Sequence, residues 1–441
     1  MEADMSGLES TTAPGIHVLG KPIGPVCDIS CDYCFYLEKQ GLFRAGEHFK
    51  MSDKVLAAYI EKYVEAQPTP VVEFVWHGGE PTLLDVDFFR RAVKLQRPFR
   101  SRKEIRNTLQ TNGMRLDDEW CEFFKANDFF VGVSLDGPKE VHDRYRKDRH
   151  GAGTFDRVMA GVRLLQKHGI EFNALACVGA ETARRPLEVY RFFKDAGIRY
   201  IQFTPIVERE ADTDTKAIKL WLARPASLDR EEINARVTPW TVEPAAYGDF
   251  LIAIYEEWVR WDVGSTFVMN FEWALSAWLG EPSSVCIFSK QCGRSVVLEH
   301  DGSLFACDHY VYPEYRLGNV LDDDLGAMVE RSVASGFGPH KASTLPRQCR
   351  ECDVRDACWG GCPKHRSATT VDGEPGLQYL CSGYRKFFRH IRKYLRAMAT
   401  LIKNDLPVSA VMQAIDGPLI VTRSAVGRPV TATQVARTTR T

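Results

Sequence analysis

Apolar runs alternate with amphipathic stretches along residues 15–207. Strands are predicted where β-branched and aromatic residues run together, at 16–20, 71–77, 105–110, 129–135, 171–178 and 200–206. Between them, apolar residues recur at helical spacing, at 53–65, 86–95, 118–126, 155–168 and 186–196. Apolar strands joined by helical crossovers are typical of parallel sheets. Six such units predict an α/β fold in which the strands form a barrel or partial barrel.

The pattern changes on both sides of this region. A basic amphipathic helix is predicted near 384–403, and a hairpin over 295–307, where Asp301-Gly302 supplies the turn. The expected organisation is a disordered lead-in (1–14), a barrel (15–244) that includes a charged, Pro-containing insertion (208–242), linker helices (245–285) with one helix over 245–261, a cysteine-rich domain (286–383), a closing helix (384–406) and a disordered tail (407–441).

Composition is that of an ordinary globular protein, and because we expect neither a secretory signal nor a membrane span, the chain should stay in the cytoplasm. Of its 441 residues, 44% are hydrophobic and 26% charged, and the net charge of −1 gives no long-range attraction to nucleic acid or anionic membranes. The first ten residues, MEADMSGLES, lack the basic and apolar segments of a secretory signal. A membrane-spanning helix needs about 18 or more apolar residues in a row, and we expect none.

The chain has 13 cysteines, which is unusual because we expect it to stay in a reducing compartment. Disulfides are rare there, so grouped cysteines point to metal binding or catalysis. Three stand close together near the N-terminus and eight lie between positions 286 and 381. The other two, Cys121 and Cys177, follow apolar patterns and are expected to be inert core residues.

Cys27, Cys31 and Cys34 form a C-x3-C-x2-C array directly after the first predicted strand. Three thiolates can hold three irons of a four-iron cluster. The fourth iron then keeps an open position, which a catalytic metal needs and a structural metal avoids. A zinc knuckle is the alternative, but zinc sites usually complete four ligands nearby and this loop offers no fourth.

This array, with the aromatic Tyr33 before its last cysteine, resembles the signature of the radical S-adenosylmethionine superfamily. The resemblance implies that the open iron chelates the amino and carboxylate groups of S-adenosylmethionine. One-electron reduction then cleaves this cofactor to a 5′-deoxyadenosyl radical. The position also fits a barrel, since active sites of (β/α) barrels lie on the loops after the strands.

Motifs after later strands extend the resemblance. The segment 77–81, HGGEP, resembles the family's GGEP motif, which binds the cofactor's amino group, and 110–113, QTNG, resembles another family element. Arg146, the last residue of the segment SLDGPKEVHDRYR (134–146), suits a carboxylate, because its planar guanidinium can bind both oxygens. The resemblance thus implies cofactor contacts from Tyr33, Gly79, Ser134, Arg146 and Val207.

The eight later cysteines suffice for two fully coordinated clusters, and their C-x2-C-x5-C-x3-C run resembles the SPASM domain of some radical enzymes. The family pattern assigns Cys286, Cys292, Cys307 and Cys362 to a nearer auxiliary cluster, and Cys349, Cys352, Cys358 and Cys381 to a farther one. Together with the first group this implies three [4Fe-4S] clusters. Two zinc sites are the alternative. We expect the region to be held by metal rather than by a large apolar core.

Asp308 directly follows Cys307, and such a Cys-Asp pair resembles the anaerobic sulfatase-maturating enzymes, in which the aspartate is the proposed base. The resemblance implies oxidation of a Cys or Ser side chain, in a sulfatase segment like C/S-x-P-x-R, to formylglycine without oxygen. It also implies a monomer served by an electron donor such as flavodoxin or ferredoxin.

Two alternatives remain open. One is another SPASM enzyme that forms thioethers or cross-links in a peptide. Many of these carry a peptide-binding domain before the barrel, which we do not expect within the 26 residues before Cys27. The other is a zinc-binding scaffold without chemistry, which iron and sulfide analysis after anaerobic purification would exclude.

Overall fold

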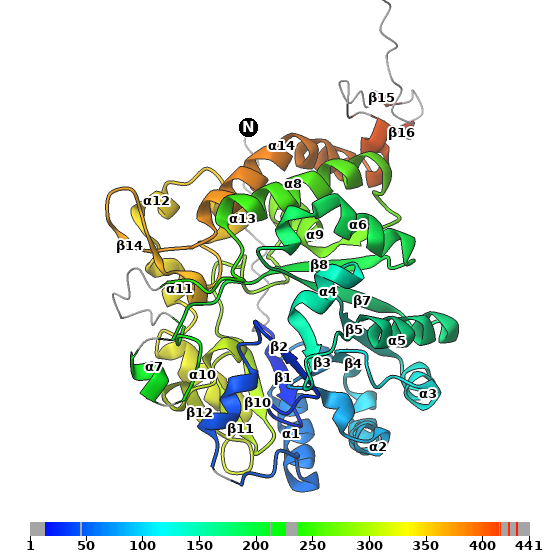
Figure 1. The fold of residues 1–441 in the computed structure, drawn as a ribbon, viewed down its shortest axis with the longest axis vertical. Helices are drawn as coiled ribbons and strands as arrows, with labels where there is room; N and C mark the ends of the chain where they lie inside the picture. Colours follow the sequence, from blue (N-terminus) through cyan, green and yellow to red (C-terminus); the bar gives the residue numbers. More distant parts are fainter. Residues whose placement is uncertain are drawn as a thin grey trace, which may run out of the picture.

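The computed structural model describes residues 14–44, 46–211, 213–217, 219–225, 236–413, 415, 422–423 and 429–430. Within these residues a ten-stranded sheet runs in the order β12-β11-β10-β1-β3-β4-β5-β7-β8-β9 and curves through the centre of the molecule (Figure 1). None of the helices in the described part of the chain has the length and apolar content that a membrane crossing requires.

The six strands and five helices predicted from the hydrophobic pattern are confirmed. The strands are β1 (His17–Lys21), β3 (Val71–Trp76), β4 (Glu104–Thr111), β5 (Phe129–Ser134), β7 (Phe172–Val178) and β8 (Tyr200–Pro205), and each pairs in parallel with its neighbour in the sheet. The helices are α1 (Asp53–Ala66), α2 (Val86–Gln96), α3 (Asp118–Ala126), α5 (Phe155–His168) and α6 (Pro186–Asp195). The barrel is therefore a partial (β/α)6 barrel.

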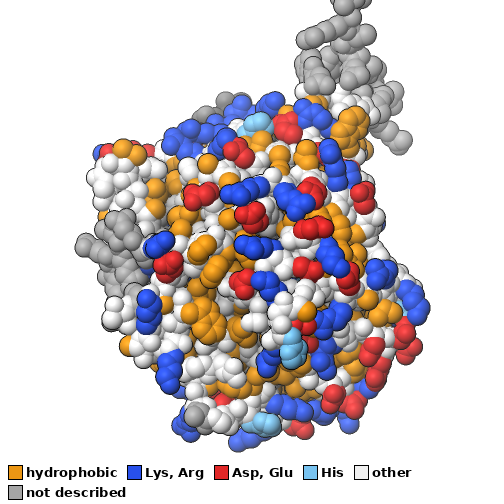
Figure 2. All heavy atoms as spheres, viewed as in Figure 1, with side chains coloured by type: hydrophobic (Ala, Val, Ile, Leu, Met, Phe, Trp, Pro, Cys, Tyr) orange, Lys and Arg blue, Asp and Glu red, His pale blue; other side chains and the backbone are white. Residues whose placement is uncertain are grey.

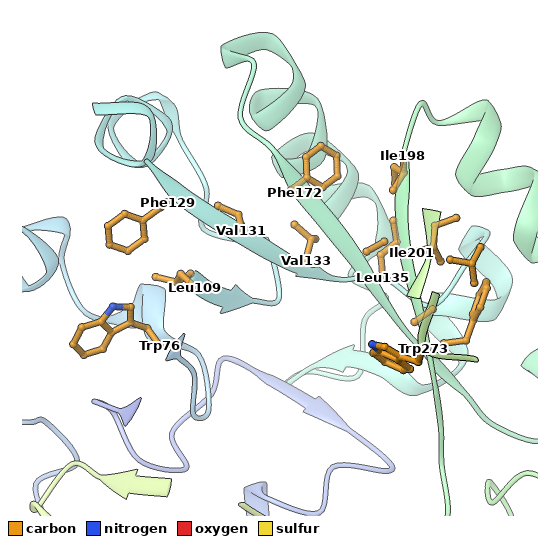
Figure 3. Packing of buried hydrophobic residues seen from close by; sticks show 14 of the residues in the cluster. Trp76, Leu109, Phe129, Val131, Val133, Leu135, Phe172, Ile198, Ile201 and Trp273 are labelled. Carbon is orange, nitrogen blue, oxygen red and sulfur yellow. The ribbon is translucent and has the colours of Figure 1, made fainter. Parts of the chain in front are cut away.

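The apolar face of these strands forms the main core. Trp76, Leu109, Val131 and Val133 are fully buried on neighbouring strands (Figure 3) and belong to the same core cluster as apolar side chains of the surrounding helices. Full burial of such a side chain contributes about 1.5–3 kcal/mol. Alternation of buried and partly exposed residues along β3 leaves the other face of the strand for a site.

The cysteine-rich region extends this sheet instead of folding apart from it. The predicted hairpin is confirmed as β10 (Ser295–Glu299) and β11 (Ser303–Phe305), followed by β12 (Arg316–Asn319). β10 pairs in parallel with β1, so that Lys21 lies beside Glu299. The free edge of β1 makes this pairing possible, since an open edge presents unpaired backbone groups.

This pairing corrects the expectation that the region lacks a large apolar core. Leu298, Leu304 and Met328 are fully buried and belong to the same core as Val18 of β1. Met328 lies on α10 (Leu325–Ala334), which packs near α1. The hairpin and α10 therefore share the apolar core of the barrel.

Two long helices lie side by side at the top of the view in Figure 1: α8 (Pro244–Trp261) and α14 (Cys381–Lys403). They approach closely because both carry glycine at the crossing. A Cβ added to Gly248 would stand 2.7 Å from the carbonyl oxygen of Gly383. The helix predicted over 245–261 is thus confirmed, and the closing helix begins three residues earlier than predicted.

The expected disorder of the tail is wrong for several residues. Val408–Gln413 form a 3-10 helix whose Val411 is buried in the core, and Thr422–Arg423 pair with Pro429–Val430. The other residues after 413, apart from 415, and the lead-in 1–13 lie outside the described residues. In the insertion, described backbone bridges join Arg209 to Val237 and Glu210 to Leu222.

The remaining elements are short. They are β2 (Ile29–Cys31), α4 (Lys139–Tyr145), β6 (Arg146–Asp148), α7 (Thr213–Ala217), β9 (Phe267–Val268), α9 (Met269–Leu279), α11 (His340–Ser343), α12 (Arg347–Arg350), α13 (Arg355–Cys358), β13 (Ala368–Thr369), β14 (Pro375–Leu377), β15 (Thr422–Arg423) and β16 (Pro429–Val430), with 3-10 turns between them. On the face in Figure 2, basic and acidic side chains are interspersed, in keeping with the net charge of −1.

Candidate active site

A cavity of about 360 Å³ lies at the carboxyl ends of the parallel strands. Its wall combines residues that end or follow six of these strands with residues of the cysteine-rich region. Among them are Lys21, Cys27, Cys31, Cys34, His77, Gly79, Gln110, Ser134, Arg146, Cys177, Thr204, Asp308, His309 and Cys362. Parallel strands direct their carboxyl ends to one edge, which explains why motifs far apart in the sequence meet here.

All three cysteines of the first group line this cavity. β2, which ends at Cys31, pairs with β6, and Arg149 just after β6 donates from Nε to the carbonyl oxygen of Cys27 across 2.9 Å. Burial, reinforced by Glu80, raises the pKa of Cys27 to about 12. The free thiol is therefore protonated near neutral pH, and a cluster held by Cys27 would displace its proton.

Gly79 and Glu80 support the loop that carries Cys27, Cys31 and Cys34. A Cβ on Gly79 would stand 1.8 Å from the carbonyl oxygen of Val26, so only glycine allows the two segments to touch. The buried Glu80 carboxylate accepts from the backbone N–H of Asn112 at 2.6 Å and from the Thr111 hydroxyl at 2.7 Å. Glu80 thereby ties the HGGEP segment to the QTNG segment.

Tyr33 and Arg146 share one carboxylate oxygen of Asp136. The Tyr33 hydroxyl donates to it at 2.7 Å and Arg146 Nε at 2.9 Å, and all three side chains are buried. Arg146 lines the cavity, and its Nε is committed to Asp136, while its contact with the cofactor stays a prediction. Sequence reasoning gave Asp136 no role, although its place in the SLDG motif after β5 was a signal.

Of the other expected cofactor contacts, Ser134 lines the cavity and Val207 does not. Ser134 lines the cavity, where its hydroxyl accepts from Gln110 Nε2 at 3.1 Å. Val207 is buried in the apolar core, while its neighbours Ile206 and Glu208 line the cavity. The side chain of Val207 therefore belongs to the core rather than to the cavity wall, and its contact with the cofactor stays a prediction. Cys177, expected to be an inert core residue, lines the cavity.

Asp308 follows β11 and lies in the same cavity. It forms an ion pair with Lys21 at the end of β1. Burial by itself would raise the pKa of the Asp308 carboxyl, but Lys21, His77 and His309 outweigh it and lower the pKa to about 2. Asp308 is therefore a carboxylate near neutral pH.

A second cavity, of about 450 Å³, adjoins the first and is lined by Cys286, Cys292, Cys307 and Cys362. Asp308 lines both cavities. Burial, together with the neighbouring Cys362 and Cys292, raises the pKa of Cys286 to about 12. The structure thus brings together the four cysteines that the family pattern assigns to the nearer cluster.

A third, small cavity of about 30 Å³ is lined by the other set: Cys349, Cys352, Cys358 and Cys381. Burial, together with Cys381 and Cys349, raises the pKa of Cys358 to about 12. Cys358 and Cys362 face different cavities although only three residues separate them. Those three, from Trp359 to Gly361, all have positive φ angles of 46–66°, which turn the chain between the two sites.

The thiol sets fit iron–sulfur clusters better than zinc. Among the described residues, no three His, Cys, Asp or Glu side chains are arranged to hold a single metal ion. Zinc draws its thiolates to about 2.3 Å from one centre. A four-iron cluster spreads the same ligands over its corners, so that their sulfurs lie farther apart.

Comparisons with known proteins agree with this geometry. Residues 22–193 match the Radical SAM superfamily, and residues 286–353 match the iron-sulfur cluster-binding domain SPASM. The serine-type anaerobic sulfatase-maturating enzyme of Bacteroides thetaiotaomicron is 43% identical, covering 92% of this chain and 97% of that protein. The cysteine-type enzyme of Clostridium perfringens is 30% identical, covering 88% of this chain and 100% of that protein.

A solved structure of native anSMEcpe with bound AdoMet and the Cp18Cys peptide matches with a TM-score of 0.75 at 30% identity, covering 88% of this chain and 100% of that one. The likeness therefore includes both the barrel and the cysteine-rich region. The chain belongs to the anaerobic sulfatase-maturating enzymes, radical S-adenosylmethionine oxidoreductases that use [4Fe-4S] clusters.

Proposed function

We propose that this protein oxidises a serine or cysteine side chain of a sulfatase polypeptide to formylglycine without oxygen. The observation that carries this proposal is a single cavity lined by Cys27, Cys31 and Cys34 on one side and by Asp308 and Cys362 on the other. A substrate side chain in this cavity would be within reach both of the cofactor held near the three cysteines, which would supply hydrogen-atom abstraction, and of Asp308, which would accept the proton.

The proposed roles follow from position. Cys27, Cys31 and Cys34 would hold the cluster that binds S-adenosylmethionine, with Tyr33, Gly79, Ser134 and Arg146 around the cofactor. When bound, the cofactor and clusters supply hydrogen-atom abstraction and one-electron transfer. Asp308 accepts the proton of the substrate hydroxyl or thiol, since its carboxylate lies at the border of the two cavities.

Two further sets of cysteines would hold the auxiliary clusters. Cys286, Cys292, Cys307 and Cys362 share the cavity next to Asp308, and Cys349, Cys352, Cys358 and Cys381 share the outer one. A cluster fully ligated by four thiolates has no open iron. Both auxiliary sites therefore suit electron transfer rather than substrate binding.

Serine is the side chain we favour as substrate. The serine-type relative is 43% identical to this chain, against 30% for the cysteine-type relative. The expected target is an extended segment resembling S-x-P-x-R.

We also propose that the chain acts as a monomer in the cytoplasm, with flavodoxin or ferredoxin as electron donor. Free clustered thiols suit the reducing compartment that this proposal assumes.

The test uses two short peptides that differ only in Ser or Cys at the first position of the S/C-x-P-x-R motif. Each is incubated anaerobically with the iron-loaded enzyme, S-adenosylmethionine and reductant, and analysed by mass spectrometry. Formylglycine should form from both peptides and faster from the Ser peptide. A third peptide with Ala at this position serves as the control.

Two results would contradict the proposal. The first is 5′-deoxyadenosine formation without formylglycine from either peptide. The second is a thioether or cross-linked product, which would favour the alternative class of peptide maturases. A faster reaction with the Cys peptide would overturn the serine preference alone.

A further inference from the structure

Lys21 is a buried charge at the centre of the active site. It is the last residue of β1 and its side chain is 1% exposed. A buried ammonium group is costly unless it is paired. Its Nζ forms an ion pair with Asp308 Oδ1 and lies 3.1 Å from the centroid of the Tyr36 ring.

Tyr36 is itself fixed. Its hydroxyl donates to Glu299 Oε1 across 2.6 Å, and its ring is buried. Glu299 lies beside Lys21 in the parallel pairing of β1 with β10. The pairing of β1 with β10 therefore positions both the ammonium group of Lys21 and Glu299, the residue that holds the Tyr36 ring against that ammonium group.

The two oxygens of Asp308 have different surroundings. Oδ1, which faces Lys21, is shielded from solvent. The side chain as a whole is 28% exposed and lines the cavity. The oxygen left to face a substrate is therefore Oδ2.

We propose that Lys21 is a positioning residue that anchors Asp308 Oδ1, so that Oδ2 is directed at the substrate hydroxyl or thiol. This inference rests on the proposed role of Asp308. A base must come within about 2.6–3.2 Å of the atom whose proton it takes. Misplacement by about 1 Å can cost about 10²-fold in rate.

A purely structural role predicts something different. The Lys21–Asp308 pair joins β1 to the segment after β11, and it could serve only to fasten these two parts together. Its loss would then lower stability and depress every activity in parallel. A positioning role predicts a loss confined to formylglycine that depends on the presence of the Asp308 carboxylate.

The experiment compares Lys21→Met, Lys21→Arg, Asp308→Asn and the Lys21→Met/Asp308→Asn double variant. Formylglycine and 5′-deoxyadenosine are measured on the same samples at matched iron content, with thermal unfolding alongside. Lys139→Met is the matched control, because Lys139 pairs with Asp156 on the surface, where their side chains are 52% and 74% exposed.

Lys21→Met should lower the turnover rate for formylglycine by about 10²-fold, with the KM for the peptide and the yield of 5′-deoxyadenosine little changed. Lys21→Arg should restore part of the rate, because it keeps a cation opposite Oδ1. In the Asp308→Asn background, Lys21→Met should cause no further loss. Lys139→Met should behave as wild type.

An equal fold-loss of formylglycine in both backgrounds would overturn the inference, as would a parallel loss of 5′-deoxyadenosine or a normal rate in Lys21→Met. If Lys21→Met fails to fold, the double variant, which removes both charges, is compared with Asp308→Asn, and Lys21→Arg with wild type. A near-normal rate in Asp308→Asn, or no formylglycine from the wild-type enzyme, would instead contradict the proposed function on which the inference rests.

Discussion

Tyr33 donates a hydrogen bond to Asp136 across 2.7 Å, which ties the loop of the first three cysteines to the end of β5. Arg146 shares the same oxygen. The orientation of the loop that lies between Cys31 and Cys34 therefore depends on a buried carboxylate from another strand.

Replacing Asp136 by Ala should destabilise the protein strongly. It leaves the Arg146 guanidinium buried without its partner, which costs about 3–5 kcal/mol. Tyr33→Phe removes only one hydrogen bond, which is worth about 1.5–3 kcal/mol because its acceptor is a carboxylate. Denaturant unfolding of the two variants tests this difference, and equal losses would show that Arg146 finds another partner.

The triple variant Cys27→Ala, Cys31→Ala, Cys34→Ala should lose about four iron atoms per chain, the content of one four-iron cluster. It should form no 5′-deoxyadenosine. Iron analysis and chromatography of the reaction products measure both quantities. Cys121→Ala, in α3 and away from the cavities, is the control and should keep its iron. Continued 5′-deoxyadenosine production by the triple variant would refute the assignment of the first cluster.

Asp308→Asn should suppress formylglycine by about 10²–10⁴-fold, the usual contribution of a general base. The amide keeps the size of the side chain but cannot take the substrate proton. Formation of 5′-deoxyadenosine should continue, because it depends on the first cysteine group. Near-normal formylglycine at matched iron content would leave the substrate proton with another acceptor.

Cys349→Ala and Cys381→Ala should each disrupt the outer cluster and expose the segment around it to protease. The barrel and the β10–β11 hairpin should stay folded, since they share one apolar core. Limited proteolysis followed by mass spectrometry should locate the new cleavage sites between residues 339 and 381. Unchanged proteolysis in both variants would argue against a structural role for the outer cluster.

Glu256 should make the packing of α8 on α14 sensitive to acid. Burial disfavours its charge, but hydrogen bonds from Arg260, His390 and Tyr394 outweigh burial and lower the pKa of Glu256 from 4.5 to about 2. A lowered folded-state pKa stabilises the fold above about pH 4.5, and this contribution is lost as the pH falls towards 2. Thermal midpoints should therefore fall less steeply in Glu256→Gln than in wild type across this window. Parallel curves would contradict the prediction.

Much of the fold was predictable from local pattern. The periods of 2 and 3.6 residues encode which face of a segment is buried, so the boundaries of β5 and α3 agree with the prediction to within one residue. The array of Cys27, Cys31 and Cys34 could also be recognised from the sequence, because its three cysteines lie in one short loop. Val207 shows the limit of such reasoning, since its family position gave no information on the direction of its side chain.

The sequence by itself therefore determined the alternation of strands and helices, the turn of the hairpin and the chemistry of the clustered thiols, all of which depend on neighbours along the chain. Only the tertiary structure decided that β10 pairs with the free edge of β1 and that Lys21 meets Asp308. It also shows how left-handed backbone turns carry Cys358 and Cys362 to different cavities, a separation that the family pattern implied but that spacing could not give. These relationships depend on the free edge of β1 and on the left-handed turns between Trp359 and Gly361. Such contacts form between distant segments and leave no period in the sequence.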